Sequence, residues 1–155
     1  MSDFFFDSSA LVKRYLSEQG TIWVRETVEP LAGHTIWIAE LTEVEAAAAL
    51  AARQRAPRGI TRHVRDATVA LLALHCSNEY RLVSCDRSIL DTAVELTQRH
   101  RLRGYDAVQL ATALAANAAL QTAGLPGPAF VAADADLLVA ARAEGLATID
   151  PNLQR

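Results

Sequence analysis

Three consecutive phenylalanines, Phe4 to Phe6, are followed immediately by Asp7, Ser8 and Ser9. A run of large apolar side chains without polar alternation is typical of a strand that is buried on both faces, as in a parallel sheet. Aspartate and serine are residues that begin helices. The sequence therefore predicts a buried strand over residues 3–7 that ends in a carboxylate, at the edge where open parallel sheets bind ligands. Capping of the next helix is the alternative role for Asp7.

The length of 155 residues and the hydrophobic content of 51% predict a single globular domain over residues 1–155. The net charge of −3 does not by itself indicate a nucleic-acid-binding protein. No apolar run is long enough to span a membrane, and the N-terminus does not show the pattern of a signal peptide. Cys76 and Cys85 form no CxxC pair, which favours ordinary thiols in a reducing compartment. We therefore expect a cytoplasmic protein with no membrane contact.

Extended and helical patterns alternate along the whole chain. We predict strands over residues 3–7, 34–38, 81–85, 129–133 and 146–149, and helices over residues 8–16, 21–28, 39–55, 61–76, 86–99, 105–120 and 134–145. Such alternation predicts an α/β fold, with a small, mostly parallel sheet that is flanked by helices on both faces.

Arginine supplies nearly all of the positive charge, because Lys13 is the only lysine. Five arginines fall between residues 53 and 65. The forked guanidinium group matches phosphate oxygens. Two interpretations stay open for this run: a solvated helix face, or contacts with an RNA backbone or an acidic partner.

Two further aspartates are expected near the same sheet edge as Asp7. Asp134 follows the strand predicted over residues 129–133, with Asp136 two residues later. Asp106 lies in the first turn of its helix, on the face that also carries Leu110. Helix capping is an adequate alternative for both residues. An aspartate on an apolar face, however, needs a partner or a solvated cleft.

The alanine-rich helix predicted over residues 39–55 contains three candidate acids, Glu40, Glu43 and Glu45. Glu45 shares a helical face with Leu41 and several alanines, whereas Glu43 shares one with Leu50. Helical periodicity alone does not decide between them, and surface placement is the alternative for each.

Up to four carboxylates could therefore meet at one site. Like charges so close together resist ionisation, and a divalent cation removes that conflict. Oxygen ligands without a nearby histidine or cysteine suit Mg²⁺ or Mn²⁺ rather than zinc, and the four histidines show neither HxH nor HxxxH spacing. Carboxylate-bound Mg²⁺ activates water and stabilises the charge that develops on phosphorus. The pattern therefore predicts phosphodiester hydrolysis.

Four motifs together resemble those of a known family. They are Asp7-Ser8-Ser9-Ala10-Leu11-Val12-Lys13, Leu41–Leu50, Leu102–Ala111, and Phe130–Asp134 followed by Leu137 and Gly145-Leu146. Their order and approximate spacing, over nearly the whole chain, resemble those of PIN-domain ribonucleases, especially the VapC-type toxins of bacterial toxin–antitoxin pairs.

The resemblance implies a Mg²⁺-dependent endoribonuclease, with Mn²⁺ as an alternative ion. Metal-activated water would cut a phosphodiester bond of RNA. The catalytic residues, which would hold one or two ions, are Asp7, Glu45, Asp106 and Asp134. Ser9 would support Asp7 by a hydrogen bond.

The resemblance also implies partners. Members of this family form homodimers, and a cognate antitoxin inserts a segment near the site to silence it. Ile22, Trp23 and Trp37 are candidates for such contacts, and burial in the core is the alternative for all three.

Two other functions stay open. Ala132 stands where the family commonly has threonine or serine. The chain could therefore be a non-catalytic PIN-like module that binds RNA or protein, and this alternative stays open. An aspartate-nucleophile phosphatase also places an aspartate after its first strand. It requires a second aspartate two residues later, where this chain has Ser9, and a lysine that Lys13 does not supply because it lies in the wrong element.

Overall fold

The computed structural model describes residues 1–154 and is built around a five-stranded sheet in the order β3-β2-β1-β4-β5. Every neighbouring pair of strands is parallel. The predicted α/β fold is therefore confirmed. β1 (Asp3–Phe6) lies in the centre, with β2 (Thr35–Ala39) on one side and β4 (Ala129–Val131) on the other. The strand order reverses between β1 and β4, and ligands of open parallel sheets bind at such a reversal.

The remaining elements follow the predicted alternation. The other strands are β3 (Tyr80–Val83) and β5 (Thr148–Ile149). The α-helices are α1 (Ser8–Leu11), α2 (Thr21–Val28), α3 (Glu40–Arg55), α4 (Arg62–Asn78), α5 (Arg87–Arg99), α6 (Gly104–Thr122) and α7 (Ala135–Ala143). Short 3₁₀ turns are η1 (Val12–Arg14), η2 (Pro30–Ala32) and η3 (Pro151–Leu153).

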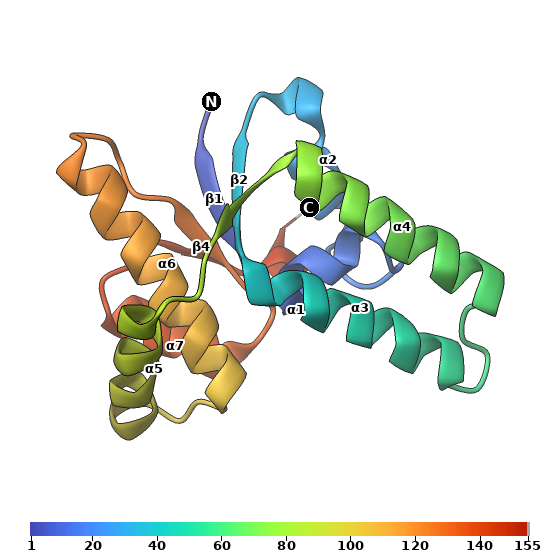
Figure 1. Ribbon diagram of the computed structural model, residues 1–155. Helices are drawn as coiled ribbons and strands as arrows, with labels where there is room; N and C mark the ends of the chain where they lie inside the picture. Colours follow the sequence, from blue (N-terminus) through green and yellow to red (C-terminus); the bar gives the residue numbers. More distant parts are fainter. Residues whose placement is uncertain (155) are drawn as a thin grey trace.

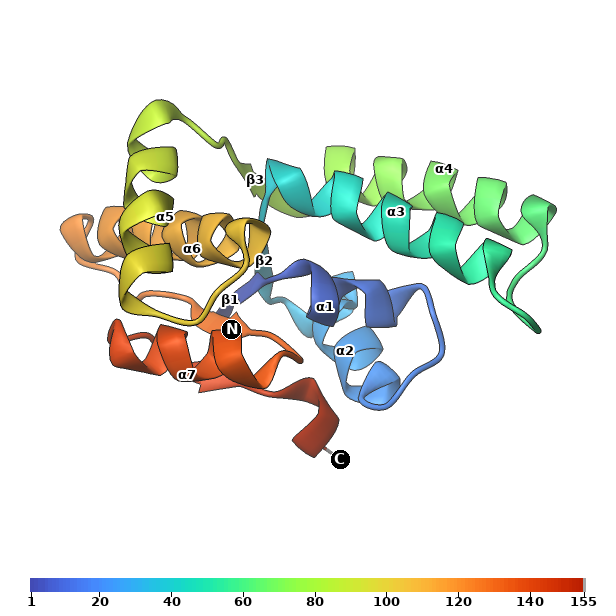
Figure 2. The same ribbon diagram turned by 90° about the horizontal axis from the view of Figure 1, so that it is seen from below.

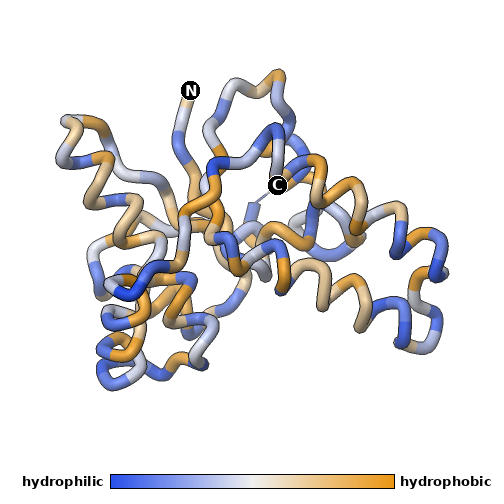
Figure 3. The backbone as a smooth tube through the Cα atoms, viewed as in Figure 1, coloured by the Kyte–Doolittle hydropathy of each residue, from blue (hydrophilic) through white to orange (hydrophobic). Residues whose placement is uncertain are grey.

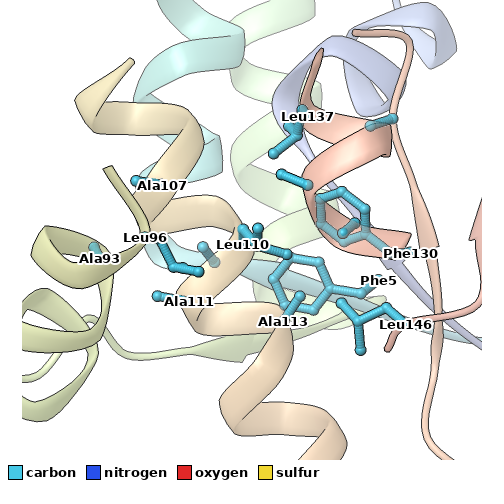
Figure 4. Packing of buried hydrophobic residues seen from close by; sticks show 14 of the residues in the cluster. Phe5, Ala93, Leu96, Ala107, Leu110, Ala111, Ala113, Phe130, Leu137 and Leu146 are labelled. Carbon is cyan, nitrogen blue, oxygen red and sulfur yellow. The ribbon is translucent and has the colours of Figure 1, made fainter. Parts of the chain in front are cut away.

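The phenylalanine run explains why β1 is central. Phe5 points into one core, where it stacks on Phe130 and is covered by α5, α6 and α7. Figure 4 shows this packing, with Leu110 and Leu137 closing over the two rings. Phe6 points to the opposite face and joins a second core with Val24. Both faces of β1 are thus apolar, and each fully buried side chain contributes about 1.5–3 kcal/mol to the free energy of unfolding.

Helices cover the sheet in two layers. α5, α6 and α7 lie on one side, and α1, α2, α3 and α4 lie on the other (Figures 1 and 2). Figure 2 views the molecule from below, and there α1, α3, α6 and α7 all begin near the middle and run outward. The beginnings of these four helices therefore surround the carboxyl ends of the central strands.

Several predicted elements are shorter than expected, such as the last strand, which covers only Thr148–Ile149, and two of these departures lie next to Asp7. The helix predicted over residues 8–16 divides into α1 and η1. The strand predicted over residues 129–133 ends at Val131, because the Ala133 amide donates to Ser9 Oγ at 2.9 Å instead of joining the sheet. Both departures occur where the chain leaves the sheet edge.

α3 and α4 form a long hairpin whose tip lies far from the sheet (Figure 1). The arginine run occupies this tip, which is largely hydrophilic (Figure 3). Arg53 pairs with Glu18 at 3.1 Å, and Arg65 contacts Asp66 at 2.6 Å. Three members of the run are exposed: Arg55, Arg58 and Arg62. Most of the run is thus exposed to solvent, which fits both interpretations of the arginine run.

The tryptophans and cysteines lie largely in the interior. Trp23 and Trp37 are partly buried and pack against the two cores, which fits the core alternative, whereas Ile22 is 73% exposed and does not fit it. Cys76 is a buried free thiol, and Cys85 is half-buried and free. No helix in residues 1–154 is both long and apolar enough to cross a membrane.

Candidate active site

Asp7 lies directly after β1 and caps α1. Its Oδ1 accepts the backbone amide of Ala10 at 2.9 Å, and Ser9 Oγ lies 2.7 and 2.9 Å from its two carboxylate oxygens. The side chain is nevertheless buried, with 3% of the residue exposed. The two roles considered from the sequence are therefore compatible: Asp7 caps a helix, and it also lies at the switch point of the sheet.

Burial raises the pKa of Asp7 from 3.8 to about 7. The hydrogen bonds from Ser9 and Ala10 oppose this increase, because they favour the charged form, and the negative charge of Glu45 adds to it. Asp7 thus titrates near neutral pH in the metal-free protein. A carboxylate with such a perturbed pKa in a cleft is a candidate for function.

The three glutamates of α3 have different surroundings, which the helical wheel could not resolve. Glu40 accepts a hydrogen bond from Ser84 at 3.0 Å, and the charge of Glu43 acts on Cys76 of α4. Glu45 accepts a hydrogen bond from Gln109 Nε2 at 2.6 Å, and its charge acts on Asp7. Of the three, Glu45 is therefore the one that shares the environment of Asp7.

Asp106 lies in the first turn of α6 and closes a capping box, in which its Oδ2 accepts the backbone amide of Arg103 at 3.3 Å. Burial raises the pKa of Asp106, and the nearby charge of Asp134 raises it further, whereas Arg103 opposes the increase. Asp106 therefore lies on the core-facing side of its helix beside a second carboxylate. This is the repulsion between like charges that the sequence predicted.

Asp134 caps α7, with its Oδ1 accepting the Leu137 amide at 2.9 Å. Asp134 and Asp106 line one hollow of about 390 Å³, together with Asp136 and the basic residues Arg101 and Arg103. Acidic and basic side chains thus border the same open space. The basic side chains could face a negatively charged substrate, and the acidic side chains could face a cation.

Three hydrogen bonds connect the segments that carry the four acids. Ser9 Oγ donates to Asp7 and accepts from the amide of Ala133, which precedes Asp134. Gln109, one turn after Asp106 on α6, donates to Glu45. The charges of Asp7 and Glu45 interact, as do those of Asp106 and Asp134. The chain therefore brings the four acids into two neighbouring pairs.

The donor chemistry of these pairs fits a hard divalent cation, since every candidate ligand atom is a carboxylate oxygen. Within residues 1–154, no three acidic, histidine or cysteine side chains lie close enough together to hold an ion as they stand. Joint binding by three or four of the acids would therefore require the two pairs to move closer together. Burial is the main cause of the raised pKa of Asp7 and of Asp106, with a smaller contribution from the neighbouring acid, and a bound cation would favour the charged form of both.

Gln109 and Thr42 were missed from the sequence. Both are polar and fully buried, with 1% and 0% of each residue exposed, and both belong to the hydrogen-bond network of Glu45. The available signal was a glutamine between Val108 and Leu110 in a largely apolar helix. Buried polar groups of this kind need partners, which pointed to a polar contact inside the fold.

The histidines have structural surroundings. His34 packs edge-on against Phe4, His75 contacts Tyr15 Oη at 2.8 Å, and His100 contacts Glu144 at 2.7 Å. His100 also lines the hollow that Asp106 and Asp134 border, with its ring directed to Glu144. Lys13 pairs with Glu18 at 3.3 Å and is likewise directed elsewhere.

The model of the PIN domain family matches residues 4–143. The chain belongs to the PIN domain family. The matched range of this PIN domain includes all four candidate acids, Asp7, Glu45, Asp106 and Asp134. None of the curated proteins compared with the chain matches it.

Solved structures share the fold at low sequence identity. FitAcB from Neisseria gonorrhoeae has a TM-score of 0.64 at 11% identity and covers 97% of this chain and 99% of its own. A toxin–antitoxin complex from Klebsiella pneumoniae has a TM-score of 0.59 at 18% identity, covering 96% and 97% of the two chains. VapC20 of Mycobacterium tuberculosis, described as a toxin that cleaves the sarcin–ricin loop, has a TM-score of 0.61 at 16% identity and covers 98% and 99%. At these identities the likeness concerns the fold.

Proposed function

We propose that this PIN domain is a metal-dependent endoribonuclease and the toxin of a toxin–antitoxin pair. Membership of the family supports a hydrolase of nucleic acids, and the neighbours in fold include a toxin described as cleaving an RNA loop and a toxin–antitoxin complex. The catalytic and metal-holding residues in this proposal are Asp7, Glu45, Asp106 and Asp134, with Ser9 as the support of Asp7.

One observation carries the proposal: the buried carboxylate of Asp7 lies at the switch point of the sheet, beside Glu45, with its pKa raised to about 7. A fold does not gain stability from burying a carboxylate that repels its neighbour. The arrangement is understandable if the site exists to bind Mg²⁺ or Mn²⁺, since a bound divalent cation favours the charged form of every acid around it.

The residues of the chain have distinct tasks in this scheme. When bound, the ion would supply activated water and would stabilise charge on phosphorus and on the leaving oxygen. Ser9 and the Ala10 amide hold Asp7 in one orientation, because they occupy both carboxylate oxygens from one side. Asp106 and Asp134 border the open hollow, and Arg101 and Arg103 at its rim would contact the phosphates of the RNA strand.

The proposal is tested by Asp7→Asn in an assay of RNA cleavage with Mg²⁺, with Mn²⁺ and with EDTA. Loss of a ligand to the ion should reduce cleavage by at least about 100-fold, and EDTA should abolish cleavage by the unaltered protein. Asp3→Asn is the matched control, because Asp3 lies at the opposite end of the same strand, and it should cleave normally.

The same assay separates the competing glutamates of α3. Glu45→Gln should lose cleavage, whereas Glu43→Gln, two residues away on the same helix, should retain it. Undiminished cleavage by both Asp7→Asn and Glu45→Gln would remove the nuclease proposal. It would leave the non-catalytic PIN-like module that binds RNA or protein.

The phosphatase alternative has little support in the structure. Ser9 donates to Asp7 where that class of enzyme places an acid–base aspartate, and Lys13 pairs with Glu18 away from the hollow. An Asp7 nucleophile would therefore lack both its proton donor and its phosphate-binding lysine.

An antitoxin is part of the proposal as the protein partner. α4 exposes an apolar stripe of Val64, Leu71 and Leu74, and Ile22 of α2 is also exposed. Exposed apolar side chains at helical spacing are the kind of surface that an amphipathic segment covers. Ile22 therefore stays a candidate contact.

A homodimer is proposed as the oligomeric state. α5 and α6 border an apolar hollow of about 430 Å³, with Leu90, Val94 and Tyr105 exposed at 38%, 60% and 64%. Val94→Glu should shift the protein from dimer to monomer in light scattering, because a buried unpaired charge opposes association. An unchanged mass for this variant would exclude this face as the dimer contact.

A further inference from the structure

Gln109 is a buried amide whose partners belong to another helix. It lies on α6 and is 1% exposed. Its Nε2 donates to Glu45 Oε2 at 2.6 Å and to Thr42 Oγ1 at 2.9 Å. Thr42 Oγ1 lies 3.2 Å from the carbonyl oxygen of the same amide, to which it donates. Thr42 and Glu45 are both on α3, so one amide joins the two helices.

The Glu45 carboxylate permits only one orientation of the Gln109 amide. A charged carboxylate accepts hydrogen bonds and donates none, so the amide must turn its NH₂ group toward Glu45. Its carbonyl oxygen lies beside the Thr42 hydroxyl, which donates to that oxygen at 3.2 Å and accepts from Nε2 at 2.9 Å. Thr42 is fully buried, at 0% exposure, so water does not substitute for it. The Glu45 carboxylate therefore sets the orientation of the amide, the Thr42 hydroxyl holds the amide in place, and the NH₂ group of the amide fixes the position of the carboxylate.

The position of Gln109 on α6 gives this contact its importance. Asp106 lies one turn earlier on the same helix, so the amide connects Glu45 to the helix that carries one acid of the other pair. Glu45 itself is near Asp7. The contact between α3 and α6 thus sets the distance between acids that come from the two helical layers.

We propose that Gln109, held in place by Thr42, is a positioning residue that directs the Glu45 carboxylate toward the other acids, an inference that rests on the proposed metal-dependent function. Neither side chain is proposed to touch the ion or the RNA. A partner that fixes a ligand is worth about 10–100-fold in metal affinity at known metal centres.

The test is Mn²⁺ binding to the full chain, measured by calorimetry without substrate. Gln109→Leu keeps the approximate size but removes the amide, and it should weaken Mn²⁺ binding by about 10-fold or more. Thr42→Val removes only a hydroxyl and should weaken binding by less, because the amide can still reach Glu45. Thr42→Ser, which keeps the hydroxyl, should recover most of what Thr42→Val loses.

Thr112→Val is the matched control. Thr112 is as buried as Thr42 and lies one turn beyond Gln109 on α6, but its hydroxyl donates to Val108 of its own helix at 2.7 Å. This variant should bind Mn²⁺ like the unaltered protein. An equal loss of Mn²⁺ affinity in Thr112→Val and Gln109→Leu would mean that general packing sets the affinity. The hydrogen bond from Gln109 to Glu45 would then not set it, and the inference would be overturned.

Cleavage kinetics give the second readout. Gln109→Leu should lower kcat with little change in KM for RNA, because the substrate is bound elsewhere. If Gln109→Leu does not fold, Thr42→Val and Thr42→Ser carry the same comparison. If the unaltered protein takes up no Mn²⁺, the proposed function fails together with the inference. If it takes up Mn²⁺ and Gln109→Leu binds equally well, only the inference fails.

Discussion

The Asp7 carboxyl group is subject to two opposed effects. Hydrogen bonds from Ser9 and Ala10 favour its charged form, and burial beside Glu45 disfavours that form. Burial is the larger effect, so the pKa rises from 3.8 to about 7. In the absence of metal, Asp7 therefore costs the fold stability whenever it is ionised.

Asp7→Asn should stabilise the metal-free protein at high pH. A pKa raised by folding contributes stability that is fully present below the ordinary pKa of 3.8 and is lost as the pH rises through about 7. At about 1.4 kcal/mol per pH unit, the loss is on the order of 4 kcal/mol. Asparagine cannot ionise, so in EDTA we expect a melting temperature several degrees higher than that of the unaltered protein near pH 8, and no gain near pH 4.

Urea unfolding at the two pH values measures this difference. A variant that is less stable than the unaltered protein at both would show that the charged carboxylate stabilises the fold without metal. Greater stability would also exclude unfolding as the cause of lost RNA cleavage by Asp7→Asn.

Metal affinity should depend on pH through the same carboxyl groups. Protons compete with the cation for Asp7, so calorimetric affinity for Mn²⁺ should fall by up to about 10-fold per pH unit below neutral pH and level off above it. The raised pKa of Asp106 acts in the same direction. An affinity that stays constant between about pH 5 and pH 8 would contradict the pKa of about 7 for Asp7.

The ends of the elements determine where these residues lie. Asp7 and Asp134 cap α1 and α7, and Asp106 closes the capping box of α6. Each acid is therefore fixed by the backbone amides of a helix that begins at the sheet edge. Helix N-termini also favour negative charge, which lowers the cost of gathering carboxylates here.

Gly20 and Gly33, both at positive φ in connections next to helices, allow a prediction about the stability of their alanine variants. Gly20, at φ +83°, begins α2, and a Cβ there would lie 2.5 Å from the Pro151 carbonyl oxygen of η3. Gly33, at φ +72°, has no atom within 4 Å of that position. Gly33→Ala should cost about 1–2 kcal/mol for the left-handed backbone alone. Gly20→Ala should cost about 1–3 kcal/mol more, because η3 must move away.

Urea denaturation of the two glycine variants separates backbone strain from close approach. Equal losses in the free energy of unfolding would show that η3 can move at little cost and does not hold the beginning of α2 in place. A larger cost for Gly20→Ala would show that the C-terminal turn is part of the cooperative fold.

At the scale of the whole molecule, the sheet separates two helical layers that each contribute to the site. Glu45 comes from α3 on one side and Asp106 from α6 on the other, with Asp7 and Asp134 at the strand ends between them. A ligand held by all four acids would join the layers only in the folded state.

Mn²⁺ should therefore raise the melting temperature. Binding only to the folded state adds about 2.7 kcal/mol when the ion is present at about 100 times its Kd. For a chain of this size that is a shift of roughly 5–10 °C. The increase should disappear in a protein that carries both Asp7→Asn and Asp134→Asn. Identical melting curves in Mn²⁺ and EDTA would show that the acids form no tight ion site.

Local sequence patterns determined the elements, their order and the candidate acids. The phenylalanine run predicted β1, and the acids that follow strands or open helices were found because capping and periodicity are encoded within a few neighbouring residues. The order of the motifs also indicated the family before the fold was known.

The tertiary structure alone decided which groups face each other. It distinguished Glu45 from Glu43, placed Gln109 against Glu45, and raised the pKa of Asp7 by burial. These properties depend on how closely α3 and α6 approach across the sheet. That distance results from the packing of residues far apart in the chain, and no pattern within one element contains it.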